Sequence, residues 1–169
     1  DTSSVSDMST WTTSGHNAVL VRRDSAINFS LASGESPAPG IGAEKYAVHW
    51  EGLITLPAGH YLFGMKHNNG AKVTIANTFT PVNSWNDTVK VKTVDFVRSQ
   101  SVTFAAGVPQ EISVDFYQTT SRMQAVLYVA DYVASGTPKW KAVTADAFSV
   151  KNEILPVGWS MSSRAVTAL

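Results

Sequence analysis

Apolar and polar residues alternate with a period of two along most of the chain, and helical periodicity is almost absent. The clearest alternation lies in residues 46–56, where one face of an extended segment carries Tyr46, Val48, Trp50, Gly52, Ile54 and Leu56. Since successive side chains of a strand point to opposite sides, this stretch predicts a long strand with one buried face. Trp50 is therefore expected in the core.

The same alternation recurs in further segments, which are separated by turn-forming residues such as Gly, Pro, Asn and Ser. Short strands with turn signals between them, and no convincing helix, predict an antiparallel β-sandwich or barrel. The expected fold class is all-β. The segments are residues 18–31, 60–67, 71–76, 87–94, 101–107, 110–117 and 124–133.

Two short segments are predicted to reverse the chain. Pro57-Ala58-Gly59 is expected to join the strand before it to residues 60–67 in a hairpin. Asn68-Asn69-Gly70 is also typical of a hairpin turn, because Asn and Gly tolerate positive φ. The two amides suit ligand contact as well, since each can donate and accept a hydrogen bond. Both interpretations of residues 68–70 stay open at this point.

The two ends of the chain differ from its middle. Residues 1–15 are dominated by Ser and Thr and are predicted to be a linker or an N-terminal arm. The alternation fades again after Val150, so residues 151–169 are predicted to be a linker towards a further module. One domain is then expected over residues 16–150. The chain begins with Asp1 and shows no signal peptide, so we expect an excised segment or a mature product.

The composition excludes several classes of protein. The chain is 44% apolar and 15% charged, which is typical of a folded globular domain. Lys and Arg number 13, as do Asp and Glu, so no net field favours nucleic acid. No apolar run is long enough for a spanning helix, so no membrane insertion is expected. The absence of cysteine excludes disulfides and thiolate zinc sites.

No catalytic motif is present. The histidines lack the spacing of a His-Glu-x-x-His metal motif, and no Gly-x-Ser-x-Gly motif occurs. The acidic residues are scattered and suggest no glycosidase pair. We therefore predict a protein that is not an enzyme. The four histidines are His16, His49, His60 and His67.

Several local patterns together resemble the protective-antigen (PA-fourteen) domain family, over roughly residues 19–150. They are Trp50-Glu51-Gly52, Pro57-Ala58-Gly59, Tyr61-Leu62-Phe63, and Asn68-Asn69-Gly70 where the family usually has Asp-Asp-Gly. Residues 101–118 are similar to a hairpin of the family, and residues 125–133 and 138–148 to its closing part. The resemblance implies an extracellular β-sandwich of the kind found in adhesins, glycosidases and toxins.

The resemblance also implies where a ligand would bind. In adhesins of this family the acidic pair holds calcium, which binds sugar hydroxyls. Asn68 and Asn69 occupy these positions but supply no charge, so no metal and no cofactor are expected. Calcium stays an alternative if Asp87 or Asp95 supplies charge. The ligand-binding candidates are Asn68, Asn69, Trp85, Gln118, Arg122 and Gln124; Trp85 either stacks on a sugar ring or anchors its own loop.

These observations predict a non-catalytic carbohydrate-binding, lectin-like or adhesion module of a larger secreted or cell-surface bacterial protein, either an adhesin or a toxin. Its expected partners are a glycan and the adjacent domains of the same polypeptide. The alternative is a structural or protein-interaction module that positions neighbouring domains. The stretch from Leu155 to Ser163 weakly resembles the lead into the repeat-rich shells of large bacterial toxins, which favours that alternative.

Overall fold

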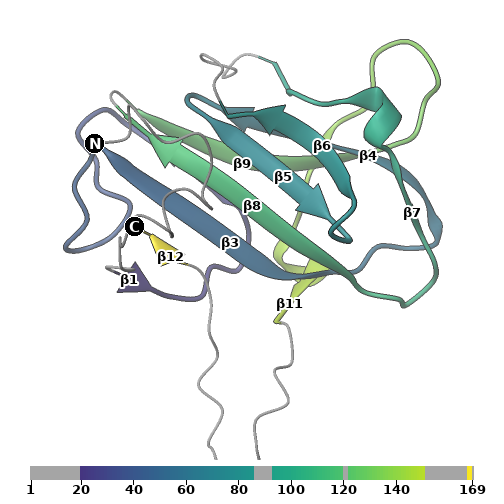
Figure 1. The fold of residues 1–169 in the computed structure, drawn as a ribbon, viewed down its shortest axis with the longest axis horizontal. Coiled ribbons are helices and arrows are strands. Elements are labelled where there is room, and N and C mark those ends of the chain that lie inside the picture. Colours follow the sequence, from purple (N-terminus) through teal and green to yellow (C-terminus); the bar gives the residue numbers. More distant parts are fainter. Residues whose placement is uncertain (1–19, 86–92, 120–121, 151–166, 169) are drawn as a thin grey trace, which may run out of the picture.

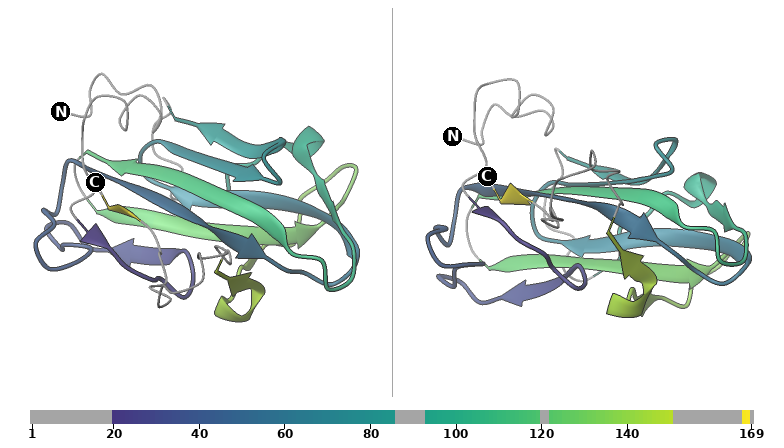
Figure 2. Two further views of the ribbon diagram at one scale, coloured as in Figure 1. Left: turned by 60° about the horizontal axis from the view of Figure 1, so that its bottom comes forward. Right: turned by 90° about the horizontal axis from the view of Figure 1, so that it is seen from below.

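Two antiparallel sheets packed face to face form the domain (Figure 1). The computed structural model describes residues 20–85, 93–119, 122–150 and 167–168. Figure 2 shows the two layers from two further directions, with the long strands of each sheet running across the molecule. The predicted all-β sandwich is therefore confirmed.

The first sheet contains seven of the described strands, in the order β1-β12-β3-β8-β5-β6, with β11 paired to β3. Its centre is the nine-residue pairing of β3 with β8, which runs from Tyr46 opposite Gln118 to Ile54 opposite Gln110. The bounds of its strands are β1 (Leu20–Val21), β3 (Tyr46–Ile54), β5 (Ala71–Ile75), β6 (Phe79–Ser84), β8 (Gln110–Gln118), β11 (Phe148–Ser149) and β12 (Thr167–Ala168).

The second sheet contains five of the described strands, in the order β10-β9-β4-β7, with β2 paired to β9. Two short 3₁₀ turns, η1 (Arg98–Gln100) and η2 (Ala145–Ala147), lie outside the sheets. None of the described helices has the length and apolar character needed to cross a bilayer. The strand bounds are β2 (Asn28–Leu31), β4 (Gly59–His67), β7 (Val102–Phe104), β9 (Met123–Asp131) and β10 (Lys141–Ala142).

The predicted hairpins are wrong, because consecutive strands belong to different sheets. Strand β4 lies in the second sheet, while β3 before it and β5 after it lie in the first. Residues 55–58 and 68–70 are therefore arches that cross between the layers. Strands β7 and β8 are likewise in different sheets, so residues 101–118 form no hairpin either. Alternation and turn residues show that the chain reverses, but they do not show which strand it then pairs with.

A tight hairpin does join β5 to β6. Its turn places Ala76 at φ 52° and Asn77 at φ 54°, and the amide of Thr78 donates to the carbonyl of Ile75 at 3.2 Å. Two successive positive φ angles match the right-handed twist of the strands they join. The positive φ expected at residues 68–70 is found here instead.

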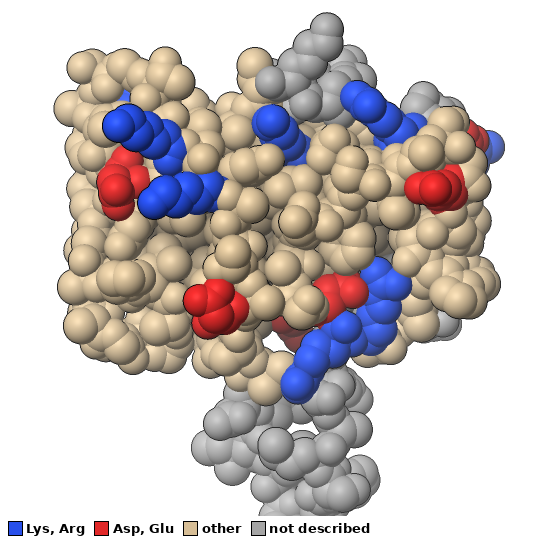
Figure 3. Space-filling model, turned by 180° about the vertical axis from the view of Figure 1, so that it is seen from behind, with Lys and Arg blue, Asp and Glu red and all other residues tan. Residues whose placement is uncertain are grey.

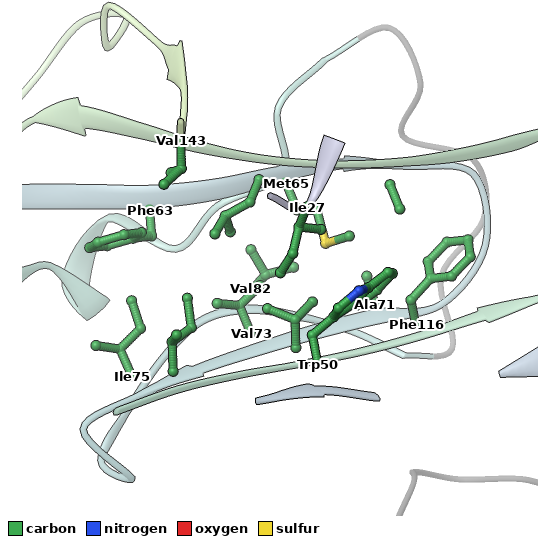
Figure 4. Packing of buried hydrophobic residues seen from close by; sticks show 14 of the residues in the cluster. Ile27, Trp50, Phe63, Met65, Ala71, Val73, Ile75, Val82, Phe116 and Val143 are labelled. Carbon is green, nitrogen blue, oxygen red and sulfur yellow. The ribbon is translucent and has the colours of Figure 1, made fainter. Parts of the chain in front are cut away.

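The core lies between the two sheets, where the inward-facing side chains of both layers meet (Figure 4). Trp50 is 4% exposed, as predicted, and its ring stacks on Phe29 with 5.6 Å between ring centroids. Alternation along each strand brings one side chain in two to this interior. Fully buried members include Phe63, Met65, Ala71, Val73, Ile75, Val82 and Phe116.

Parts of the predicted organisation lie outside the described residues. These are residues 1–15, predicted to be a linker, residues 151–166 of the predicted C-terminal linker, and most of the predicted strand 87–94. Thr167 and Ala168 form β12, which pairs with His49 and Val48 of β3.

Candidate functional site

The two loops that the family resemblance assigns to ligand binding meet at one end of the sandwich. Asn68, in the arch after β4, donates from Nδ2 to the carbonyl of Arg122. Its Oδ1 accepts from the backbone amide of Gln124 at 2.7 Å. The side chain is 6% exposed. Asn68 therefore fixes the arch to the start of β9, and both ends of its amide are occupied.

A second set of hydrogen bonds joins Asn69 to β8. Its Nδ2 lies 3.2 Å from Oε1 of Gln118, and its Oδ1 accepts from Oγ1 of Thr119 at 2.6 Å. Gln118 is fully buried and donates from Nε2 to the carbonyl of Arg122 at 3.2 Å. We call Asn68, Asn69, Gln118 and Thr119 the loop-end amide cluster.

These contacts show that the domain itself occupies several of the loop amides. Asn68 and Gln118 are buried because their amides take the place of strand pairing where the chain changes sheets. A buried main-chain carbonyl or amide needs such a partner. Asn69 and Gln124 are half-buried, and Arg122 is exposed with only its carbonyl bound in this cluster. These three residues keep side-chain surface exposed to solvent at this end of the sandwich.

Trp85 does not offer a ring face to a ligand. It is 4% exposed, and its ring meets Tyr117 edge-on at 4.9 Å between centroids. A Cβ on Gly70 would lie 2.0 Å from Cε1 of Tyr117 and 2.2 Å from the carbonyl oxygen of Trp85. Residue 70 is therefore glycine because two neighbours approach its backbone closely, and it does not have a positive φ. Trp85 is thus a packed residue directly after β6.

A buried histidine supports the same arch. Both ring nitrogens of His67 face acceptors: Nδ1 lies 2.5 Å from the carbonyl of Asn69, and Nε2 lies 3.2 Å from Oδ2 of Asp95. That carboxylate oxygen also accepts from Ser84. His67 thus links the arch to the carboxylate of Asp95, which Ser84 also contacts. No local sequence signal links these residues.

Asp95, one of the two acids considered for calcium, contacts His67 and Ser84, and Asp87 lies outside the described residues. Within the described part of the chain, no three His, Asp or Glu side chains are grouped closely enough to hold a metal ion. The amides and hydroxyls of the loop end are suited to hydrogen bonding with a polar, uncharged ligand.

Two titratable side chains of β3 are perturbed. His49 Nδ1 lies 2.6 Å from Oδ1 of Asp115 on β8. This hydrogen bond, more than the charge of Asp115 or of Glu51, raises the pKa of His49 against the opposing effect of burial. Burial raises the pKa of Tyr46 to about 12. Both shifts arise from the packing of β3 and from the contacts of His49 with Asp115 and Glu51.

A cleft that sequence reasoning missed opens elsewhere, at the β3 edge of the sandwich. Its volume is about 260 Å³, and it lies between the connector 23–27, strands β3 and β8, and residues 145–150 around β11. Its lining combines apolar side chains of the core with Arg23, Asp24 and Glu51. These residues come from distant parts of the chain, so no local sequence motif predicted that they would form a cleft.

Comparison with known proteins finds no matching family model and no matching curated protein. Among solved structures, an anti-sigma factor domain-containing protein from Clostridium clariflavum matches with TM-score 0.64 and 23% identity, over 85% of this chain and 44% of that chain. The PA14 sugar-binding domain from an RTX adhesin matches with TM-score 0.53 and 13% identity, over 75% and 77%. The PA14 domain of the MpAFP antifreeze protein gives 0.51 and 15%, over 78% of both chains.

At identities of 13–23% these likenesses show the fold alone. The chain spans less than half the length of the anti-sigma factor domain-containing protein that it matches. The resemblance to protective-antigen domains is thus supported in part, at the level of the sandwich. The same sandwich occurs in proteins with other names, so the fold by itself does not assign a ligand.

Proposed function

We propose that this domain is a non-catalytic module that contacts carbohydrate and serves adhesion, within a larger secreted or cell-surface protein. The observation that carries the proposal is the convergence of the two loop segments at one polar end of a sandwich shared with a sugar-binding PA14 domain. The PA14 domain of an antifreeze protein shares the same fold. Its partners would be a glycan and the neighbouring domains of its own chain.

The surface charge is compatible with a neutral ligand. The net charge of the chain is zero. On the face drawn in Figure 3, the Lys, Arg, Asp and Glu side chains lie in small groups with uncharged surface between them. A neutral glycan needs hydrogen-bond donors and acceptors more than a field of one sign. At the loop end, Asn69, Arg122 and Gln124 would supply them, while Asn68 and Gln118 hold the loops in place.

This contact would not need calcium. An amide oxygen is a neutral ligand, and calcium affinity depends strongly on the number of charged ligands. The amides of the cluster are instead hydrogen-bonded to one another and to main-chain atoms. Direct hydrogen bonding to sugar hydroxyls is the interaction that this chemistry favours.

A specific observation favours a second candidate, a structural module that positions neighbouring domains. Both ends of the Asn68 amide are occupied within the domain, and so are both ends of the Asn69 amide. The fold also matches 44% of a longer anti-sigma factor domain-containing chain. A sandwich whose loops are held internally serves well as a rigid spacer.

Glycan-array binding separates the two functions. The wild-type domain is compared with an Arg122→Ala/Gln124→Ala variant, and Lys139→Ala serves as a matched control on an exposed loop residue. Each array is run with calcium and with a chelator. Binding that survives chelation, is lost in the double variant and persists in the control supports the proposal. Binding that requires calcium contradicts its metal-free part. No binding by folded wild-type protein favours the structural module.

A further inference from the structure

The cleft at the β3 edge exists because the described strands leave part of this edge unpaired. Strand β11 pairs with Leu53 and Ile54, and β12 pairs with Val48 and His49. Residues 50–52 lie between these two pairings and form one wall of the cleft. The connector 23–27 also lines the cleft. Among the described residues, this position leaves space for a small molecule.

The floor of the cleft is apolar. Ile112 and Val114 reach it from β8 and are 5% and 0% exposed. Phe148 of β11 is half-buried and closes one side, and Trp50 of β3 lies beside the connector. Such a floor favours a ligand that has one face made of carbon and hydrogen.

The rim of the cleft is polar, and one of its carboxylates is held in place. Asp24 accepts from Nε1 of Trp50 at 3.0 Å through Oδ2 and pairs with Nε of Arg22 at 2.8 Å through Oδ1. A carboxylate has about four acceptor positions, so two remain after these contacts. Arg23 and Glu51 are exposed on the same rim and add donors and a further acceptor.

These groups together define the ligand. Arg22 balances the charge of Asp24, and Arg23 and Glu51 have opposite signs, so the rim favours a neutral molecule. Acceptors on Asp24 and Glu51 with donors on Arg23 suit hydroxyl groups, which both donate and accept. The volume of about 260 Å³ is just below the range of roughly 300–1,000 Å³ typical of pockets for drug-sized ligands. That space suits one substituted six-membered ring.

We propose that this cleft is a second carbohydrate subsite, which takes a single neutral pyranose ring with its apolar face on Phe148 and Ile112 and its hydroxyls on Asp24, Arg23 and Glu51. The subsite rests on the proposed glycan-binding function and places part of that function away from the loop end. The loop-end cluster and the cleft share no residue, so each can be altered without touching the other.

The test is titration of the isotopically labelled 169-residue domain with neutral methyl glycosides, followed by NMR. The indole N–H resonance of Trp50 reports on the cleft, because that group is hydrogen-bonded to Asp24. Arg23→Ala removes a rim donor, and Ala145→Trp obstructs the mouth from an exposed position. Ala106→Trp, on the exposed loop after β7, is the matched control for the added indole.

We expect a glycoside to shift the Trp50 indole resonance in wild type and in Ala106→Trp. Loss of one charge-assisted hydrogen bond should weaken binding about tenfold or more in Arg23→Ala, and Ala145→Trp should abolish it. Melting temperatures near the wild-type value establish that each variant is folded.

Three outcomes overturn the subsite. Glycoside binding that is lost in Arg122→Ala but unchanged in Arg23→Ala and Ala145→Trp refutes the cleft while leaving the proposed function standing. No glycoside binding by folded wild-type protein refutes both. A concentration-dependent dimer that Ala145→Trp dissociates assigns the cleft to a second copy of the chain instead.

Discussion

Tyr46 offers a stringent test of the packing inside the sandwich. Its side chain is 2% exposed, and its hydroxyl has no hydrogen-bond partner in the described part of the structure. An unpaired buried hydroxyl costs about 1–3 kcal/mol, because its hydrogen bonds to water are lost on folding. Tyr46→Phe removes the oxygen and keeps the ring. We expect this change to raise the free energy of unfolding by about 1 kcal/mol at pH 7.

The same hydroxyl makes the effect depend on pH. Burial raises the pKa of Tyr46 from 10.0 to about 12, so between these values the unfolded chain loses a proton that the folded chain keeps. The free energy of unfolding therefore falls as pH rises through this window. At pH 11 the wild type loses about 1.4 kcal/mol from this group. Tyr46→Phe does not, so its advantage grows from about 1 kcal/mol at pH 7 to about 2.4 kcal/mol at pH 11.

The assay is urea unfolding, followed by tryptophan fluorescence, at pH 7 and pH 11. Tyr132→Phe is the matched control, because Tyr132 is 38% exposed and its hydroxyl reaches solvent. The control should match wild type at both pH values. A Tyr46→Phe variant less stable than wild type at pH 7 would refute the reasoning, since the hydroxyl would then have a partner, such as a buried water molecule.

Three further predictions concern the loop end and β3. Asn68→Asp loses the donor to the Arg122 carbonyl and should lower the free energy of unfolding by about 2–3 kcal/mol in urea; no loss would contradict the bridging role. Gly70→Ala should cost about 1–3 kcal/mol in the same assay, because its Cβ would overlap a neighbouring ring; a neutral result would contradict the close approach. The hydrogen bond that His49 donates to Asp115 raises the pKa of His49. The stabilisation from this bond is complete below about pH 6.5 and is lost as pH rises through the folded-state pKa. Asp115→Asn should therefore lower the melting temperature more at pH 5 than at pH 9. An equal loss at both pH values would contradict the stabilising role of the His49–Asp115 hydrogen bond.

The strands were predictable from the sequence because alternation is a local property. Each inward-facing position of β3 could be read from residues 46–54, and Trp50 is buried as that pattern predicts. The pairing of strands was not predictable in the same way. Residues 55–58 look like a turn whether the next strand lies beside β3 or in the opposite layer, since both need a reversal. The family resemblance implied the sandwich but not these crossings.

For the candidate site, the sequence indicated which loops to consider but not the contacts within them. The resemblance placed Asn68, Asn69, Gln118, Arg122 and Gln124 in two loops, and the structure brings those loops together. Whether an amide faces solvent or a carbonyl depends on atoms contributed by a segment some 50 residues away, as the separation of 54 between Asn68 and Arg122 illustrates. The burial of Asn68 and Gln118 could therefore not be predicted from local sequence patterns.

The hydrogen bonds of Asn68 explain why this position carries a neutral amide and not a carboxylate. Its Nδ2 donates to the Arg122 carbonyl while its Oδ1 accepts from the Gln124 amide, so the position needs a donor and an acceptor at once. A carboxylate has the same shape but only accepts, and it would face the Arg122 carbonyl oxygen with no proton between them. It would also place a charge on a side chain that is 6% exposed, which is costly without a cation. An arch held by hydrogen bonds within the domain thus favours Asn at this position, whereas an arch that holds calcium favours Asp. The two side chains differ only in that an NH₂ group of Asn replaces one carboxylate oxygen of Asp.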